Sequence, residues 1–117
     1  MKKQILDLRV KSVEQLGFRY SLIKLTSDES LPIIYPGQFV EVRVDHSSQT
    51  FLRRPISVNF VDVENQELWL LVAQVGHGTR QLSKLVPGEF LNCLLPLGNH
   101  FTIPTDINTK VLLVGGG

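Results

Sequence analysis

The stretch FLRRPISVNF, residues 51–60, has the composition of a β-strand that is interrupted by two arginines and a proline. Pro55 has no backbone N–H, and a strand paired on both sides does not tolerate that loss. The sequence places no acidic residue beside Arg53 and Arg54. Because a guanidinium group matches phosphate and Ser57 adds a hydroxyl, the stretch predicts one edge of a site for a phosphorylated ligand. An exposed edge strand with solvated arginines explains the same residues equally well.

Length and composition are those of one soluble domain. The chain has 117 residues, 43% hydrophobic and 20% charged, which suffices for one buried core. The formal net charge of +1 gives no sign of nucleic-acid binding. No apolar run approaches the roughly twenty residues that span a bilayer, and no signal-peptide core follows the N-terminal lysines. Cys93 is the single cysteine, which fits a reducing compartment. We therefore expect a cytoplasmic protein that binds neither nucleic acid nor membrane.

Alternating apolar and polar residues predict a series of short strands. The predicted strands cover residues 5–13, 18–22, 39–44, 52–61, 67–75 and 89–95, with a short extension at 101–103. In the second strand, Phe18, Tyr20 and Leu22 form the expected apolar face. Residues 67–75 are continuously apolar, which implies cover on both faces, and Trp69 is expected in the core. Six short strands and a single helix favour a small antiparallel barrel, because closure removes exposed edges.

A second candidate site is the turn GHGT, residues 76–79, with the helix expected after it. Thr79 is the predicted N-cap, Leu82 and Leu85 lie at helical spacing, and the Pro-Gly pair at 87–88 ends the helix. Glycines let a backbone approach a ligand closely, and a helix N-terminus directs N–H groups at an anion. The arginine stretch and this turn could therefore address one diphosphate. An ordinary strand-to-helix turn with a threonine cap is the alternative.

The sequence indicates neither a metal site nor a catalytic residue. His46, His77 and His100 lack the spacing of metal ligands. No serine, histidine and acid combination suggests nucleophilic catalysis. Cys93 lies in an apolar segment and is expected to be a small buried hydrophobe.

The last residues do not fit the barrel pattern. Residues 110–117, KVLLVGGG, are an apolar strand followed by three glycines, which is typical of the opening of a parallel nucleotide-binding unit. The helix that would complete such a unit is not in the sequence. We expect residues 1–108 to form the barrel domain, and residues 109–117 to be the first strand and glycine turn of a truncated NAD-binding domain.

Five segments in this order resemble the FAD-binding domain of the ferredoxin reductase superfamily. They are PGQFVEVRV at 36–44, RRPISV at 53–58, VGHGTRQLSKLVPG at 75–88, LLPLGNHF at 94–101 and KVLLVGGG at 110–117. Within the superfamily, the sequence is most similar to the electron-transfer subunits of two-subunit, NAD-dependent dihydroorotate dehydrogenases. The resemblance implies a six-stranded antiparallel Greek-key barrel that holds FAD. It also implies a following NAD domain and a cysteine-rich tail with a [2Fe–2S] cluster.

The resemblance assigns the cofactor-binding residues one by one. Arg54 would bind the FAD diphosphate, and Pro55, Ile56 and Ser57 would border the flavin ring. Leu71, Val72 and Ala73 would line the cofactor through backbone groups, and Gly78 and Thr79 would hold the phosphates. Many reductases of the superfamily carry an aromatic residue in the place of Ile56, where it stacks on the flavin, so this chain departs from them there.

The function implied by the resemblance is that of a component of an NAD-dependent oxidoreductase. The subunit would pass reducing equivalents from a dihydroorotate dehydrogenase catalytic subunit to NAD in pyrimidine biosynthesis, within a heterotetramer. The chain alone is not expected to be catalytically complete, since NAD and the cluster belong to the region that follows. Two alternatives stay open: the flavin subunit of a hydrogenase, sulfide dehydrogenase or transhydrogenase complex, and a barrel that serves only as an assembly module without redox chemistry.

Overall fold

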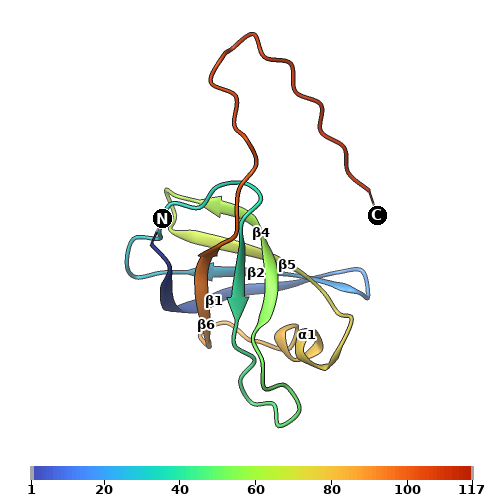
Figure 1. Ribbon diagram of the computed structural model, residues 1–117. Coiled ribbons are helices and arrows are strands. Elements are labelled where there is room, and N and C mark those ends of the chain that lie inside the picture. The colour runs from blue at the N-terminus through green and yellow to red at the C-terminus, as the bar shows by residue number, and fades with distance from the viewer. Residues whose placement is uncertain (1, 117) are drawn as a thin grey trace.

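The computed structural model describes residues 2–116, and residues 4–97 form a closed antiparallel barrel with one helix (Figure 1). The strands are β1 (Gln4–Leu16), β2 (Tyr20–Thr26), β3 (Phe39–Val42), β4 (Arg54–Asp62), β5 (Glu67–Ala73) and β6 (Phe90–Leu97), and the helix is α1 (His77–Leu82). Their order around the barrel is β1-β2-β5-β4-β3-β6, and β6 pairs with β1 to close it. The predicted six-stranded barrel with one short helix is confirmed.

The barrel core consists of inward-facing residues from all six strands. It contains Leu8, Val10, Ile23, Leu25, Val40, Val42, Ile56, Leu68, Leu70, Val72, Leu91, Cys93 and Leu95. Leu82 of α1 joins this cluster with 2% of its surface exposed, so the helix covers one end of the barrel (Figure 1). The described part of the chain contains no helix of the length and apolar character that crossing a membrane requires.

The predicted inward face of the second strand was wrong. Phe18 lies in the β1–β2 turn and is 93% exposed, and Tyr20 is half-exposed. The residues that face the core are Ser21, Ile23 and Leu25, all of them fully buried. The predicted strand ended at residue 22, whereas β2 continues to Thr26, and because side chains alternate along a strand, Ile23 and Leu25 beyond the predicted end decide which face is inward. Ile23 and Leu25 outweigh the buried hydroxyl of Ser21, which donates a hydrogen bond to the side chain of Gln15 (3.1 Å).

Trp69 lies outside the core, contrary to the prediction. β5 alternates, with Leu68, Leu70 and Val72 inside the barrel and Trp69 on its outer face. The indole ring is covered by Phe60 of β4, with ring centroids 4.9 Å apart, and by the ammonium of Lys24, 4.0 Å from the ring centroid. These contacts shield the outward-facing indole ring from water. They explain why the sequence of β5 is apolar at positions on both faces of the strand.

Glu67, at the start of β5, is a buried carboxylate, and its ionisation is expected to make the stability of the barrel depend on pH. Its side chain accepts hydrogen bonds from Lys11 and from the indole N–H of Trp69 (2.9 Å), and both lower its pKa. A carboxylate with a lowered pKa stabilises the fold above its unfolded pKa of about 4.3, and this stabilisation is lost as the pH falls through the folded value. The urea midpoint should therefore fall more steeply below pH 5 for the wild type than for Glu67→Gln. Glu64→Gln, which removes an exposed carboxylate from the same hairpin, is the control; equal pH profiles for wild type and Glu67→Gln would contradict the assignment.

Cys93 is fully buried in β6, as the sequence predicted. Burial raises the pKa of its thiol to about 12. The thiol is therefore protonated at neutral pH and acts as a core side chain.

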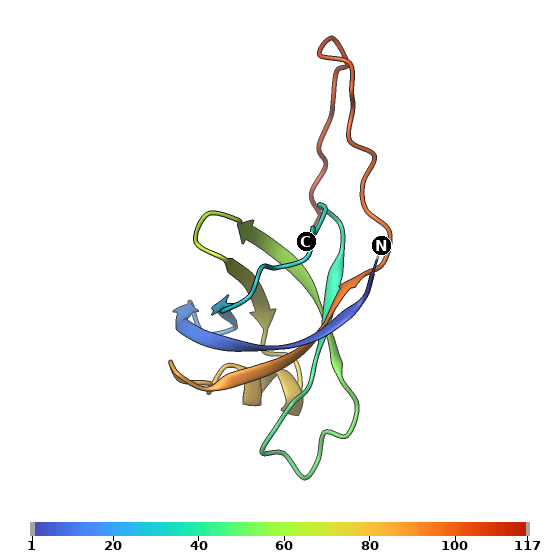
Figure 2. The same ribbon diagram turned by 90° about the vertical axis from the view of Figure 1, so that its left-hand side faces the viewer.

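Residues 98–116 leave the barrel at the end opposite α1 and extend away from it (Figures 1 and 2). The structure forms no strand at 101–103 or at 110–114, which the sequence predicted. Val111, Leu112, Leu113 and Val114 are exposed. A strand needs a paired neighbour, and no described residue pairs with this segment. Gly117 lies outside the described residues, and the assignment of 109–117 to a second domain stays a prediction.

Candidate functional site

Two sequence segments that each suggested a ligand site meet at the α1 end of the barrel. Arg54 begins β4, and Gly78 is the second residue of α1. A Cβ atom placed on Gly78 would lie 3.2 Å from Cδ of Arg54 and 3.3 Å from Cγ2 of Thr50. Glycine at this position therefore allows the arginine side chain to lie directly against the start of α1. The fold thus brings together two segments that are more than twenty residues apart in the sequence.

The two neighbouring arginines have different environments, which the sequence did not distinguish. Arg53 donates to the backbone oxygens of Glu41 (3.1 Å) and Asn92 (3.2 Å) and to the Asn92 side chain. The Asn92 amide then donates to Asp7 (2.7 Å). Arg53 therefore links β3, β6 and β1 and is a structural residue.

Arg54 has no such partners. Its Nε donates to the backbone oxygen of Arg53 (3.1 Å), and among residues 2–116 no carboxylate lies within ion-pair distance of it. Arg53 likewise has no carboxylate partner among the described residues, but its donors are used by neutral oxygens within the barrel, whereas the guanidinium of Arg54 is not held in this way. A guanidinium group without a carboxylate partner, lying against the backbone of α1 at Gly78, suits an anionic ligand.

The loop between β3 and β4 forms the third wall of the site. Its Ser47 hydroxyl is 3.0 Å from Nε2 of His77 in α1 and accepts the backbone N–H groups of Gln49 (3.3 Å) and Thr50 (3.2 Å). The loop is thereby fixed against the helix. A cavity of about 320 Å³ lies between them, lined by Gln49, Thr50, Phe51, Leu52, Arg54, His77 and Gly78. The sequence analysis missed the loop residues, because nothing in their spacing shows that the loop folds onto α1.

Thr79 is the third residue of α1 and not its N-cap, so that prediction was wrong. Gly76 is the N-cap. The Thr79 hydroxyl accepts the N–H groups of Val75 and Gly76 (3.0 Å each) and donates to the backbone oxygen of Gly76 (3.1 Å). The hydroxyl therefore stabilises the turn before the helix. Thr79 would have to contact a phosphate through its backbone N–H and not through its hydroxyl.

The start of β4 and the end of β5 do not pair with each other. The described β4–β5 ladder runs from Asp62–Glu67 to Val58–Leu70 and ends there. Residues 54–57 pair with β3, and residues 71–73 pair with β2. The predicted cofactor-binding residues of these strands thus lie on neighbouring segments of β4 and β5 that are not paired with each other. The missing N–H of Pro55 therefore removes no hydrogen bond between β4 and β5.

Side chains on these two segments differ in exposure. Pro55 and Ser57 are exposed on the outer face of β4, whereas Ile56 is 8% exposed and packs in the core. On β5, Leu71 is 41% exposed and Val72 is buried. Ser57 and Leu71 therefore present a hydroxyl and an apolar group outward, and Ile56 supports them from inside.

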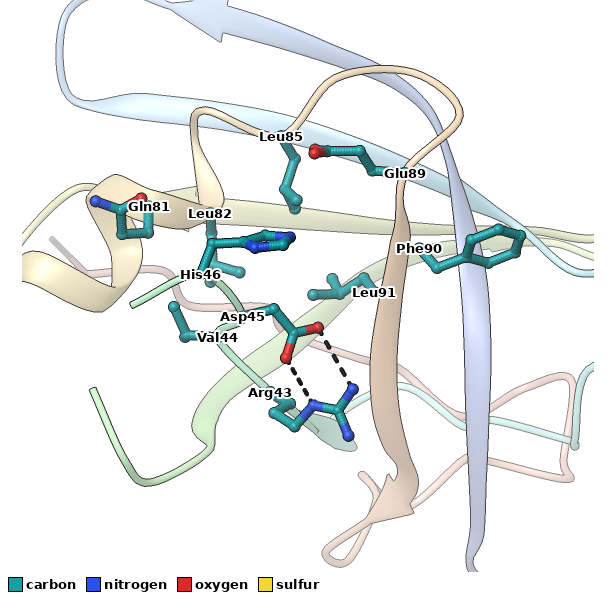
Figure 3. A pocket seen from close by; sticks show the side chains of 10 residues that line it. All are labelled: Arg43, Val44, Asp45, His46, Gln81, Leu82, Leu85, Glu89, Phe90 and Leu91. Atoms are coloured by element: carbon teal, nitrogen blue, oxygen red, sulfur yellow. Dashed lines mark hydrogen bonds and ion pairs between the residues drawn. The ribbon is translucent and has the colours of Figure 1, made fainter. Parts of the chain in front are cut away.

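A second cavity, of about 260 Å³, lies on the other side of α1 (Figure 3). It is bounded by residues 43–46 after β3, by the C-terminal part of α1 and by the start of β6. Two of its charged groups, Arg43 and Asp45, form an ion pair (2.8 Å), and the hydrogen bond to Asp45 raises the pKa of Arg43; Glu89 also lines the cavity. None of the predicted site residues lines this cavity.

The barrel has the fold of electron-transfer reductases. A cytochrome P450 reductase, GcoB, from Amycolatopsis superposes with a TM-score of 0.75 and 26% identity, covering 91% of this chain and 32% of that protein. Phthalate dioxygenase reductase, described as a modular structure for electron transfer from pyridine nucleotides to [2Fe–2S], superposes with a TM-score of 0.71 at 21% identity, covering 86% of this chain and 32% of the reductase. No protein-family model matches the chain. The fold therefore defines a reductase-type barrel domain.

Sequence comparison identifies the family more narrowly. The electron transfer subunit of dihydroorotate dehydrogenase B (NAD(+)) from Desulforamulus reducens is 34% identical over 114 residues, which is 97% of this chain and 43% of that protein. The subunit of the same name from Shouchella clausii is 37% identical over 117 residues, covering 99% of this chain and 45% of the relative. The chain is thus a relative of these electron transfer subunits, as its motifs indicated. It spans less than half of their length.

Proposed function

We propose that this chain is the FAD-binding part of an electron-transfer subunit that passes reducing equivalents from a dihydroorotate dehydrogenase catalytic subunit to NAD. The observation that carries this proposal is the side chain of Arg54, which lies against Gly78 without a carboxylate partner. When bound, FAD exchanges two electrons with a nicotinamide and can also pass them singly. The protein supplies position and charge.

The residues of the site fit the diphosphate of FAD. The cavity beside Arg54 is lined by no acidic side chain, so nothing there repels an anion. The guanidinium can donate two parallel hydrogen bonds to phosphate oxygens, and the absence of a side chain at Gly78 leaves room for close approach. Gly78 and Thr79 would contribute backbone N–H groups.

The flavin ring is proposed to lie along the segments of β4 and β5 that do not pair with each other. Ser57 would offer a hydroxyl to a ring heteroatom, and Leu71 an apolar surface. Backbone groups of residues 71–73 and of Pro55 would border the ring. Ile56, which is turned into the core, would support the strand without stacking on the flavin.

The remaining features of the whole subunit are proposed from the relatives. Residues 1–108 would be the FAD domain, and residues 109–117 would begin an NAD domain. A [2Fe–2S] cluster and NAD would be bound by the region that follows. The relatives are electron transfer subunits by name, which supports the existence of a catalytic partner subunit. We expect a heterotetramer of two subunits of each kind, in the cytoplasm.

Titration of the purified chain with FAD, followed by flavin absorbance, tests the proposal with a matched pair of glycine variants. The wild type should show saturable flavin binding, and Gly78→Ala should bind about tenfold more weakly, because its Cβ displaces Arg54 and narrows the site. Gly76→Ala is the control, since a Cβ there contacts nothing within 4 Å. A wild-type chain that binds no flavin, alone or with the following region of its subunit attached, would refute the proposal.

A further inference from the structure

We propose that Gln38 is a positioning residue, which ties the segment leaving β6 to the loop before β3 and thereby sets how the region after the barrel approaches the flavin. We term residues 98–101, which follow β6, the exit segment. The inference rests on the proposed function, in which a nicotinamide-binding region follows the barrel. Gln38 is not among the residues proposed to contact the cofactor.

The side chain of Gln38 is fully buried and joins two parts of the chain that are far apart in the sequence. Its Oε1 accepts the backbone N–H of Tyr35 (2.9 Å), and its Nε2 donates to the backbone oxygen of Gly98 (3.0 Å). An uncharged amide suits this position because it offers an acceptor and a donor at once. Buried hydrogen bonds of this kind are costly to break, so the loop and the exit segment are held together.

Three further contacts hold the exit segment against the same loop. The backbone N–H of Phe101 donates to the backbone oxygen of Pro36 (2.9 Å), and the ring centroids of Tyr35 and His100 lie 4.7 Å apart. Gly37 has φ of +101°, and a Cβ atom placed on it would lie 3.1 Å from the backbone nitrogen of Phe101. The exit segment is therefore held at both of its ends.

The loop that holds the exit segment also holds β4, along which the flavin ring is proposed to lie. The backbone oxygen of Gln38 accepts the N–H of Val58 (3.1 Å), and Phe39, the next residue, pairs with Ser57. Gln38 thus contacts the exit segment through its side chain and the strand of the proposed flavin site through its backbone. Both views show the loop and the exit segment at the same end of the barrel (Figures 1 and 2). The chain that follows Phe101 therefore starts from a point that is fixed relative to Ser57.

A fixed starting point matters because hydride transfer depends steeply on distance. The reacting atoms of the two rings must come within about 3–3.5 Å, and a misplacement of about 1 Å can slow a reaction about 100-fold. Gln38, which is buried, contacts neither ring and acts through the exit segment. Its hydrogen bonds set the approach of the nicotinamide-binding region to the flavin.

The test uses the whole subunit, with the region that follows Gly117, and separates the rate of flavin reduction from the affinity for FAD. Gln38→Leu removes both hydrogen bonds of the amide. We expect reduction of the bound flavin by saturating NADH, followed by anaerobic stopped-flow absorbance, to be about tenfold slower in this variant. Its affinity for FAD and its reduction by dithionite, which needs no nicotinamide, should equal those of the wild type. A merely structural role of Gln38 would instead lower the affinity for FAD.

Gly37→Ala and Gly88→Ala are a matched pair that tests the same inference without removing a buried hydrogen bond. Both glycines have positive φ values, +101° and +95°, so the backbone cost of replacement is similar. The Cβ at residue 37 presses on Phe101, whereas a Cβ at residue 88 meets nothing within 4 Å. We expect slower flavin reduction by NADH, by about threefold, in Gly37→Ala only.

The outcomes separate this inference from the proposed function. Unchanged reduction by NADH in Gln38→Leu and Gly37→Ala would overturn the positioning role, while FAD binding would stand. A loss of FAD affinity as large as the loss of rate would overturn it as well, because Gln38 would then support the flavin site itself. If Gln38→Leu does not fold, the two glycine variants decide. A wild-type subunit that binds no FAD, or whose flavin is not reduced by NADH, would remove the proposed function and this inference with it.

Discussion

Replacing Arg54 with alanine is expected to weaken FAD binding about 30-fold and to change the free energy of unfolding by less than about 0.5 kcal/mol. The affinity loss follows from removal of charge-assisted hydrogen bonds to the diphosphate, which contribute about 1.5–3 kcal/mol. Stability should hardly change, because the Arg54 side chain makes one local hydrogen bond, to the backbone of Arg53. Flavin absorbance titration gives the affinity, and urea unfolding followed by fluorescence gives the stability.

Arg53→Ala is the matched variant, one residue away. We expect it to lower the stability of the barrel, which Arg54→Ala should leave nearly unchanged. Arg53→Ala removes the donors that satisfy backbone oxygens of Glu41 and Asn92 and the buried side chain of Asn92. The backbone oxygen of Asn92 keeps the N–H of Arg43 (2.9 Å), but Oδ1 of the buried Asn92 side chain loses its charged donor, which should lower the free energy of unfolding by about 2–3 kcal/mol. If Arg54→Ala destabilises the barrel as much as Arg53→Ala does, or binds FAD as the wild type does, the separation of roles is wrong.

Gly98→Ala is expected to lower the free energy of unfolding by about 3 kcal/mol. Gly98 follows β6 with φ of +79°, a left-handed conformation that L-residues adopt at a cost of about 1–2 kcal/mol. Its added Cβ would also lie 2.8 Å from Cε1 of Phe39, so the ring must move. The backbone oxygen of Gly98 accepts a hydrogen bond from buried Gln38 (3.0 Å), which ties the same turn to the start of β3.

Gly17→Ala isolates the backbone contribution of this effect. Gly17 has φ of +69° in the β1–β2 turn, and an added Cβ contacts nothing within 4 Å. It should therefore lower the free energy of unfolding by about 1 kcal/mol. The urea midpoints of both variants give the difference, which is the cost of displacing Phe39. Equal losses in the two variants would mean that the ring moves without cost.

Much of the barrel follows from patterns that are local in the sequence. The alternation around Leu8 and Val10 predicted β1, and each predicted strand of residues 5–95 overlaps an observed one. The motifs indicated the relatives correctly. Strand ends depend on turns, and in β2 the prediction ended before Ile23 and Leu25, the two residues that face the core, so the inward face was assigned wrongly.

The sequence by itself determined the six strands of the barrel, the single helix, the burial of Cys93 and the two segments that suggest a diphosphate site. These features depend on composition and on periods of a few residues, which neighbouring side chains fix. Only the tertiary structure decided that Arg53 is bonded within the barrel while Arg54 has no carboxylate partner among residues 2–116, because the neighbours of the two arginines come from β3, β6 and α1. It also placed Trp69 outside the core and Phe51 beside a cavity. Contacts between residues distant in the chain are set by how the barrel closes, and no local pattern encodes them.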